Sequence, residues 1–169
     1  CSGLTSIALP ASVKSINRSV FARCFGLTSL VIPSSINTIG ESAFSQCDRL
    51  ISLTIPSSVT SIGKQAFYNC TALTYITVMW PTPLDISSSQ DVFNNVNKVN
   101  CTLKVPLGTK LLYSASNQWK DFTNIVEIPS FVLSSVNVNV PATQSSTATV
   151  NVTTGVSWTT SSDKAWLTI

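Results

Sequence analysis

Four cysteines recur at one constant spacing, and sulfur chemistry is the first reactivity that the sequence suggests. They are Cys1, Cys24, Cys47 and Cys70, and each interval is 23 residues. Such a column could form disulfides or hold a metal ion, but the short C-x₂₋₄-C spacings of zinc sites are absent. Cysteine is also among the residue types most often fully buried. We therefore expect free thiols stacked in a core, with disulfides as the alternative and no metal.

A fifth cysteine, Cys101, breaks the spacing. Counted back from Pro106, it occupies the fifth position of its repeat instead of the first. A thiol reacts as the thiolate and needs access to solvent. Outside the buried column, Cys101 is expected to be the most reactive thiol, with partial burial as the alternative.

The remaining titratable residues form no catalytic set. The sequence has no His, so it lacks the usual general base and the commonest metal ligand. The Asp and Glu residues form no pair that repeats or flanks an expected cleft. These observations predict a chain that is not an enzyme and needs no cofactor. The acids are Glu41, Asp48, Asp85, Asp91, Asp121, Glu127 and Asp163.

Charge and composition exclude two further classes. Lys and Arg number 10 against 7 acids in 169 residues, and this net charge of +3 is too small for a nucleic-acid-binding surface. No apolar run approaches the roughly 20 residues of a transmembrane helix. Charged residues make up 10% of the chain, whereas Ser and Thr number 27 and 20. The surface is therefore expected to carry mainly hydroxyl groups.

The elements that position these residues follow from the repeats that begin at each Cys. CSGLTSIALPASVKSINRSVFAR, CFGLTSLVIPSSINTIGESAFSQ and CDRLISLTIPSSVTSIGKQAFYN align without a gap. Apolar residues fill the fourth, seventh and ninth positions, and this alternation predicts a short strand that Pro10, Pro33 or Pro56 ends. The apolar pair that closes each repeat, such as Ala43-Phe44, suits one helical turn on the outer side.

One column of each repeat carries a backbone prediction. Asn17, Gly40 and Gly63 share the seventeenth position. Gly and Asn are the residues that tolerate a positive φ most readily. We therefore predict a left-handed residue there.

A repeat with a single strand cannot bury its apolar face alone, so successive repeats must stack. Residues 1–128 are expected to form a right-handed leucine-rich-repeat solenoid of five coils, with a parallel sheet on one side and turns and short helical segments on the other. An insertion of about four residues falls in 83–95, after which Asp91-Val92-Phe93 restores the closing pair. A helix and a last strand at Ile125–Ile128 should then cap the stack. The cap residues are Leu111, Leu112, Tyr113, Trp119 and Phe122.

The composition changes from Pro129 onward to alternating Val, Asn, Thr and Ser, as in residues 136–140 and 148–152. This pattern predicts antiparallel strands with one buried face. The expectation for residues 129–169 is the N-terminal part of an all-β sandwich, cut off before completion.

The repeat C-x-x-L-T-S-L-x-I-P-S-S-V-x-S-I-G-x-x-A-F resembles the BspA-type leucine-rich repeats of surface proteins from Bacteroides-group bacteria and some mucosal parasites. The resemblance extends through LKVPLGTKLLYSASNQWKDFTNIVEI. It implies an exported protein, extracellular or at the cell surface, that binds other proteins or matrix. The tail TGVSWTTSSDKAWLTI resembles the start of an immunoglobulin-like BACON domain, which implies a link to glycan binding, although Trp158 and Trp166 are expected to be core residues.

The residues between the core positions of each strand should face outward, and they carry the candidate binding site. This face is nearly uncharged and has few of the large anchors that dominate interfaces. Its candidates lie toward the last coils. For Trp80 the alternative is packing over the inserted loop. The ligand-binding candidates are Tyr75, Thr77, Met79, Trp80 and Lys104.

The function expected from these features is a non-catalytic, cell-surface binding or adhesion module whose sheet contacts a protein, for example a host matrix protein. One alternative is a glycan-binding accessory segment of a carbohydrate-active surface protein. Another is a structural spacer that binds nothing. The chain opens at Cys1 without an initiator Met or a signal-peptide pattern, so it is expected to be a mature or excised piece.

Overall fold

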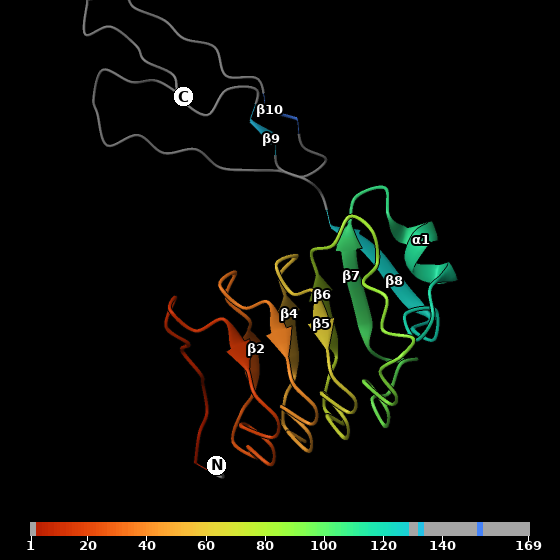
Figure 1. Ribbon diagram of the computed structural model, residues 1–169. Coiled ribbons are helices and arrows are strands. Elements are labelled where there is room, and N and C mark those ends of the chain that lie inside the picture. Colours follow the sequence, from red (N-terminus) through yellow and green to blue (C-terminus); the bar gives the residue numbers. More distant parts are fainter. Residues whose placement is uncertain (1–2, 129–131, 134–151, 154–169) are drawn as a thin grey trace, which may run out of the picture. The chain divides into compact units, whose positions relative to one another are not determined.

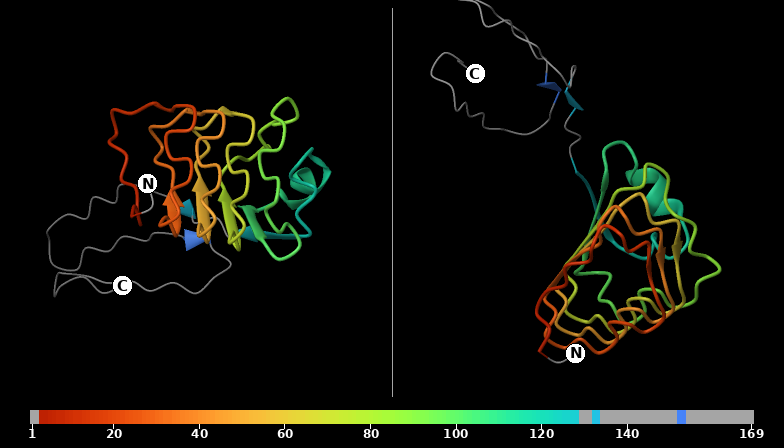
Figure 2. Two further views of the ribbon diagram at one scale, coloured as in Figure 1. Left: turned by 90° about the horizontal axis from the view of Figure 1, so that it is seen from below. Right: turned by 60° about the vertical axis from the view of Figure 1, so that its left-hand side comes forward.

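The computed structural model describes residues 3–128, 132–133 and 152–153. The chain divides into two compact units, Cys1–Ile128 and Pro129–Ile169. The first is a solenoid of stacked coils, as expected from the 23-residue period (Figure 1). Seen along the stack, the coils follow one another as nested loops (Figure 2, right).

A parallel sheet of five strands forms one side of the solenoid. Its order is β2-β4-β6-β7-β8, so the strands of successive coils lie side by side. Leu30 pairs with Leu53, and Leu53 with Ile76, so each residue faces its own repeat position in the next coil. The sheet and the last strand are confirmed. The strands are β2 (Ser29–Val31), β4 (Ser52–Ile55), β6 (Tyr75–Val78), β7 (Thr102–Pro106) and β8 (Asn124–Ile128).

A second parallel sheet lies where short helical segments were expected. It consists of β1 (Ser15–Ile16), β3 (Thr38–Ile39) and β5 (Ser61–Ile62) in that order. The helical turn expected around Ala43-Phe44 is wrong, because that segment forms turns. The Phe44 N–H donates to the Ala66 carbonyl of the next coil at 2.8 Å, and such bonds between coils replace those within a helix.

The expected left-handed residue at the glycine column is also wrong. Among the described glycines, only Gly108 has a positive φ, at 79°. Gly40 is required by a close approach instead, because an added Cβ would lie 2.8 Å from the Arg18 nitrogen. The Gly40 N–H reaches the Ile16 carbonyl at 2.7 Å, so the two coils touch backbone to backbone. Asn17 lies in the first coil, and no earlier described coil packs against it, so no close approach requires Gly at that position.

Left-handed residues occur elsewhere, two in each of four successive coils and four positions apart, and Gln118 of the cap is a single further case. Each pair flanks the closing Phe of its coil, and none of these residues is Gly. The pair recurs after the insertion, at Asp91 and Asn95. The residues are Ser19 and Arg23, Ser42 and Gln46, Gln65 and Asn69, and Asp91 and Asn95.

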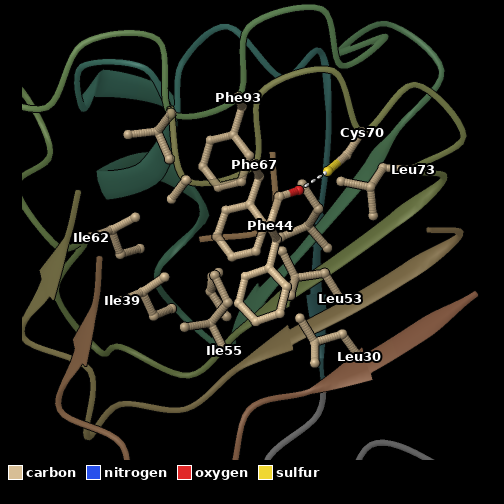
Figure 3. Close-up of a cluster of buried hydrophobic side chains, with 14 of the residues drawn as sticks. Leu30, Ile39, Phe44, Leu53, Ile55, Ile62, Phe67, Cys70, Leu73 and Phe93 are labelled. Carbon is tan, nitrogen blue, oxygen red and sulfur yellow. Dashed lines mark hydrogen bonds between the residues drawn. The ribbon is translucent and has the colours of Figure 1, made fainter. Parts of the chain in front are cut away.

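Phenylalanine rings stack through the centre of the solenoid (Figure 3). Phe21, Phe44, Phe67 and Phe93 follow one another with centroid distances of 5.3, 5.5 and 5.6 Å. The Phe67 N–H also donates to the Val92 carbonyl at 3.0 Å, so Asp91-Val92-Phe93 restores the closing pair as expected. Trp119 of the cap ends the stack, 5.4 Å from Phe93.

The cysteine column lies in the core, and its thiols are free in the part that the structure describes. Cys24, Cys47 and Cys70 are fully buried and form no disulfide. The thiols of Cys47 and Cys70 donate to the carbonyls of Phe21 and Phe44, at 3.2 and 3.3 Å. The expectation of stacked free thiols is thus confirmed for these three residues.

Cys101 is not the accessible thiol that its position suggested. It is fully buried and free, and burial raises its pKa to about 11. It belongs to the same core as Leu103 and Val105, the buried residues of the strand that follows it.

The cap combines α1 (Lys110–Ala115) with the turns that follow it. Tyr113, Trp119 and Phe122 are buried, as expected. Leu111 and Leu112 are 83% and 49% exposed, so their expected role in covering the stack is wrong. The helix is only six residues long and lies with one side against the sheet, so Tyr113 alone points inward.

In the second unit, β9 (Val132–Leu133) pairs with β10 (Val152–Thr153) in antiparallel fashion. The rest of the sandwich expected for residues 129–169, including Trp158 and Trp166, lies outside the described residues.

Candidate interaction surface

The outward side of the five-stranded sheet, here called the sheet face, presents two columns of side chains. The register places residues of one column next to each other on neighbouring strands. The first column is Ser29, Ser52, Tyr75, Thr102 and Asn124, and the second is Val31, Thr54, Thr77, Lys104 and Val126.

Tyr75 and Lys104 form the most distinctive contact of the sheet face. The Lys104 Nζ lies 4.6 Å from the centroid of the Tyr75 ring, which is within the range of a cation–π interaction. Tyr75 is 47% exposed, so the pair remains open to solvent. β6 and β7 are adjacent strands, and Lys104 pairs with Thr77, two residues along from Tyr75.

Lys104 is the one charged side chain among the outward-facing residues of these five strands. Glu127 also lies in β8 and is exposed, but it pairs with Val105, so the alternation of the strand places it on the opposite side of the sheet from Lys104 and Val126. Its carboxylate accepts the Lys110 N–H at 2.9 Å at the start of α1, and this hydrogen bond lowers the pKa of Glu127. Within the described residues, Lys104 has no acidic partner.

The other candidates surround this pair. Thr77 is partly buried between Tyr75 and Met79, and Met79 is 40% exposed just beyond the end of β6. The sequence reasoning missed Asn124 and Val126, which extend both columns onto β8. The Asn124 amide donates to the Thr102 hydroxyl at 2.8 Å, and Val126 is 37% exposed beside Lys104. Their alternation with buried Ile125 is the signal that could have revealed them.

Trp80 does not belong to the sheet face. It is only 5% exposed, and its indole N–H donates to the Val59 carbonyl at 2.8 Å. Its ring lies 5.9 Å from that of Trp119, and its carbonyl accepts the Tyr113 hydroxyl at 2.9 Å. Trp80 therefore joins the fourth coil to the cap. Its burial agrees with the alternative of packing, but its contacts are with Val59 and the cap, and none with the inserted loop is seen in the described part of the chain.

A polar cleft of about 580 Å³ lies between the fourth coil, which carries the insertion, and the cap. Lys98 and Asp121 form an ion pair across it at 3.6 Å, with partial exposure of both side chains. The cleft holds no pairing of a nucleophile with a base. Among the described residues, no three His, Cys, Asp or Glu side chains are placed to hold a metal ion. The cleft is lined by Gln90, Asp91, Asn94, Lys98, Gln118 and Asp121.

Comparison with known proteins gives a consistent result. The profile of the BspA type leucine rich repeat region matches residues 1–114 in six copies. The crystal structure of a leucine-rich repeat protein from T. pallidum is similar, with 30% sequence identity and a TM-score of 0.52 over 62% of this chain. The match spans 50% of that protein. None of the curated proteins matches the chain. No helix in the described part is long and apolar enough to cross a bilayer.

Proposed function

The chain belongs to the BspA-type leucine-rich repeat family, and from this premise we propose that it is a non-catalytic binding module of the cell surface. Its sheet face contacts a protein partner, and a host matrix or surface protein is the partner class expected of an adhesion role. Proteins of this family are typically exposed at the surface and bind other proteins. The polar cleft offers no competing catalytic arrangement.

The observation that carries the proposal is the half-exposed Tyr75–Lys104 pair on an otherwise small-residue, hydroxyl-rich platform. Tyr is one of the residues that dominate protein interfaces, because it combines a large apolar area with a polar end. Ser and Thr neighbours let a partner approach the strands closely. A single large anchor in a flat surround is the arrangement from which interface hot spots are built.

The test is a matched pair of substitutions on the two sheets. Thr77→Arg places a bulky cation in the middle of the sheet face. Thr38→Arg places the same residue at the exposed position of β3, in the other sheet. Binding of the full chain to immobilised matrix proteins should fall at least tenfold with Thr77→Arg and stay unchanged with Thr38→Arg. Equal binding by both variants, or no binding by the unmodified chain, would contradict the proposal.

A further inference from the structure

We infer that the sheet face recognises a polypeptide segment with a single carboxylate, which Lys104 binds, flanked by apolar residues. The inference rests on the proposed function and names the chemistry of the partner. Lys104 is a lone cation on a face without an anion in the described residues, so an approaching carboxylate meets attraction and no like charge.

The position of the Lys104 ammonium is fixed before a partner arrives. Contact with the Tyr75 ring restricts a long side chain that is otherwise free to adopt many rotamers. An ammonium has three N–H donors, and a ring face satisfies the charge without using all of them. Donors are therefore left for a carboxylate, and less freedom is lost when it binds.

The surroundings of Lys104 define the rest of the partner. Val126 lies next to it on β8 at 37% exposure, and Met79 follows the end of β6 at 40% exposure. Apolar side chains on both sides require apolar groups next to the carboxylate, because polar ones would lose water without gaining hydrogen bonds. The hydroxyls of Thr77 and Thr102 can meet backbone N–H and C=O groups between them.

The same count of charges argues against a sulfated glycan. Such a polymer carries an anion on most of its sugar units, and binding it requires several cations along one face. The sheet face has one cation, and the net charge of the whole chain is only +3. A lone carboxylate in a mainly uncharged peptide matches this charge, and we commit to the peptide.

The experiment uses a display library of random twelve-residue peptides, selected on the full chain and depleted on a Thr77→Trp variant, whose bulky uncharged side chain blocks the sheet face, so that only face-dependent peptides remain. These peptides should be enriched in one Asp or Glu with apolar neighbours. Lys104→Glu should weaken them at least tenfold, Lys104→Arg should retain most of the affinity, and selection on Lys104→Glu should yield Lys or Arg in place of the acid.

The outcomes separate the two claims. Face-dependent peptides without an acid, or equal binding to the Lys104→Glu variant, would overturn the inference and leave the proposed function standing. Recovery of no face-dependent peptide would count against both. A heparin oligosaccharide is included as a second probe, and if it binds the sheet face in preference to the selected peptides, the inference fails. Circular dichroism and thermal unfolding should show that all variants fold alike.

Discussion

The regular coils, residues 24–78, and the C-terminal end, residues 79–128, are stabilised in different ways. In the regular coils many core residues pack on the same residue type of the next coil, as Phe44 does on Phe67 at an interplanar angle of 2°. At the C-terminal end unlike residues meet. Trp80 packs against Trp119 at 56°, and the Gln118 amide donates to the Ile86 and Ser89 carbonyls. Contacts that repeat from coil to coil form the stack, and aromatic and polar contacts found only at the cap end it.

This difference bears on where recognition can arise. Small residues such as Ser29, Ser52 and Thr54 offer a similar surface in successive coils, so they cannot fix the register of a partner. The Tyr75–Lys104 pair spans the junction between the regular coils and the C-terminal end. Departures from the repeat are thus the positions at which one partner can be distinguished from another.

The largest effect is expected from the ring stack. Phe67 has ring neighbours on both sides, whereas Phe122 has Phe93 as its stacking partner, at 5.7 Å and edge-on. Phe67→Ala should lower the free energy of unfolding by about 3–5 kcal/mol, and Phe122→Ala by less, because a smaller part of the stack is lost. Urea unfolding of both variants measures this. Equal losses would remove the distinction between the two regions.

A second effect concerns the thiols of the two regions. Burial raises the pKa of Cys101 to about 11 and that of Cys70 higher still. An unfolded thiol ionises near pH 9, so the folded state retains its proton over a range in which the unfolded state loses it. Stability should be unaffected below about pH 9 and fall as the pH rises toward 11, by roughly 2–3 kcal/mol for Cys101 at 1.36 kcal/mol per unit.

The measurement is urea unfolding at a series of pH values, with Cys101→Ala as the control that should reduce the slope without abolishing it, because burial also raises the pKa values of Cys24, Cys47 and Cys70. Labelling with a thiol reagent at pH 8 should be slow for every described cysteine until the protein unfolds. As the pH rises, Cys101 should react before Cys70. Rapid labelling of Cys101 at pH 8 would show that it is accessible after all.

The smallest effect tests the backbone contact between coils. Gly63→Ala would place a Cβ 2.5 Å from the Glu41 nitrogen, whereas Gly3→Ala meets nothing within 4 Å. Gly63→Ala should cost about 1–3 kcal/mol through overpacking, and Gly3→Ala should cost almost nothing. Thermal unfolding of the pair compares them. A neutral Gly63→Ala would mean that the coils can separate without loss.

The architecture was predictable because the alignment of the repeats alone gives both the period of the coils and the register of their strands. Once the repeats align at 23 residues, Leu30 must lie beside Leu53, and the outward columns follow from alternation. The second sheet was not predictable, since its strands are two residues long and depend on bonds between coils. The reason for the glycine column was not predictable either, because a positive φ and a close approach of two backbones both favour Gly.

Parts of the candidate site were equally hard to foresee. Tyr75 and Lys104 could be placed on one face from their repeat positions, but their contact depends on side-chain conformations. The burial of Trp80 depends on Trp119, which lies 39 positions later in the sequence and in the cap. The exposure of Leu111 and Leu112 follows from how α1 is oriented, which its short apolar pattern leaves open.

The fourth coil, which carries the insertion, shows that the length of one coil can change while the stacking of the coils does not. Tyr75 pairs with Thr102, 27 positions later instead of 23, yet the strands stay in register and the left-handed pair reappears at Asp91 and Asn95. Extra chain is absorbed away from the strands, in residues 83–95. Loops of other lengths can therefore be grafted at exposed Ser87 and Ser88, between the Ile86 and Ser89 carbonyls that hold Gln118, which gives protein engineers an attachment point that leaves the platform intact.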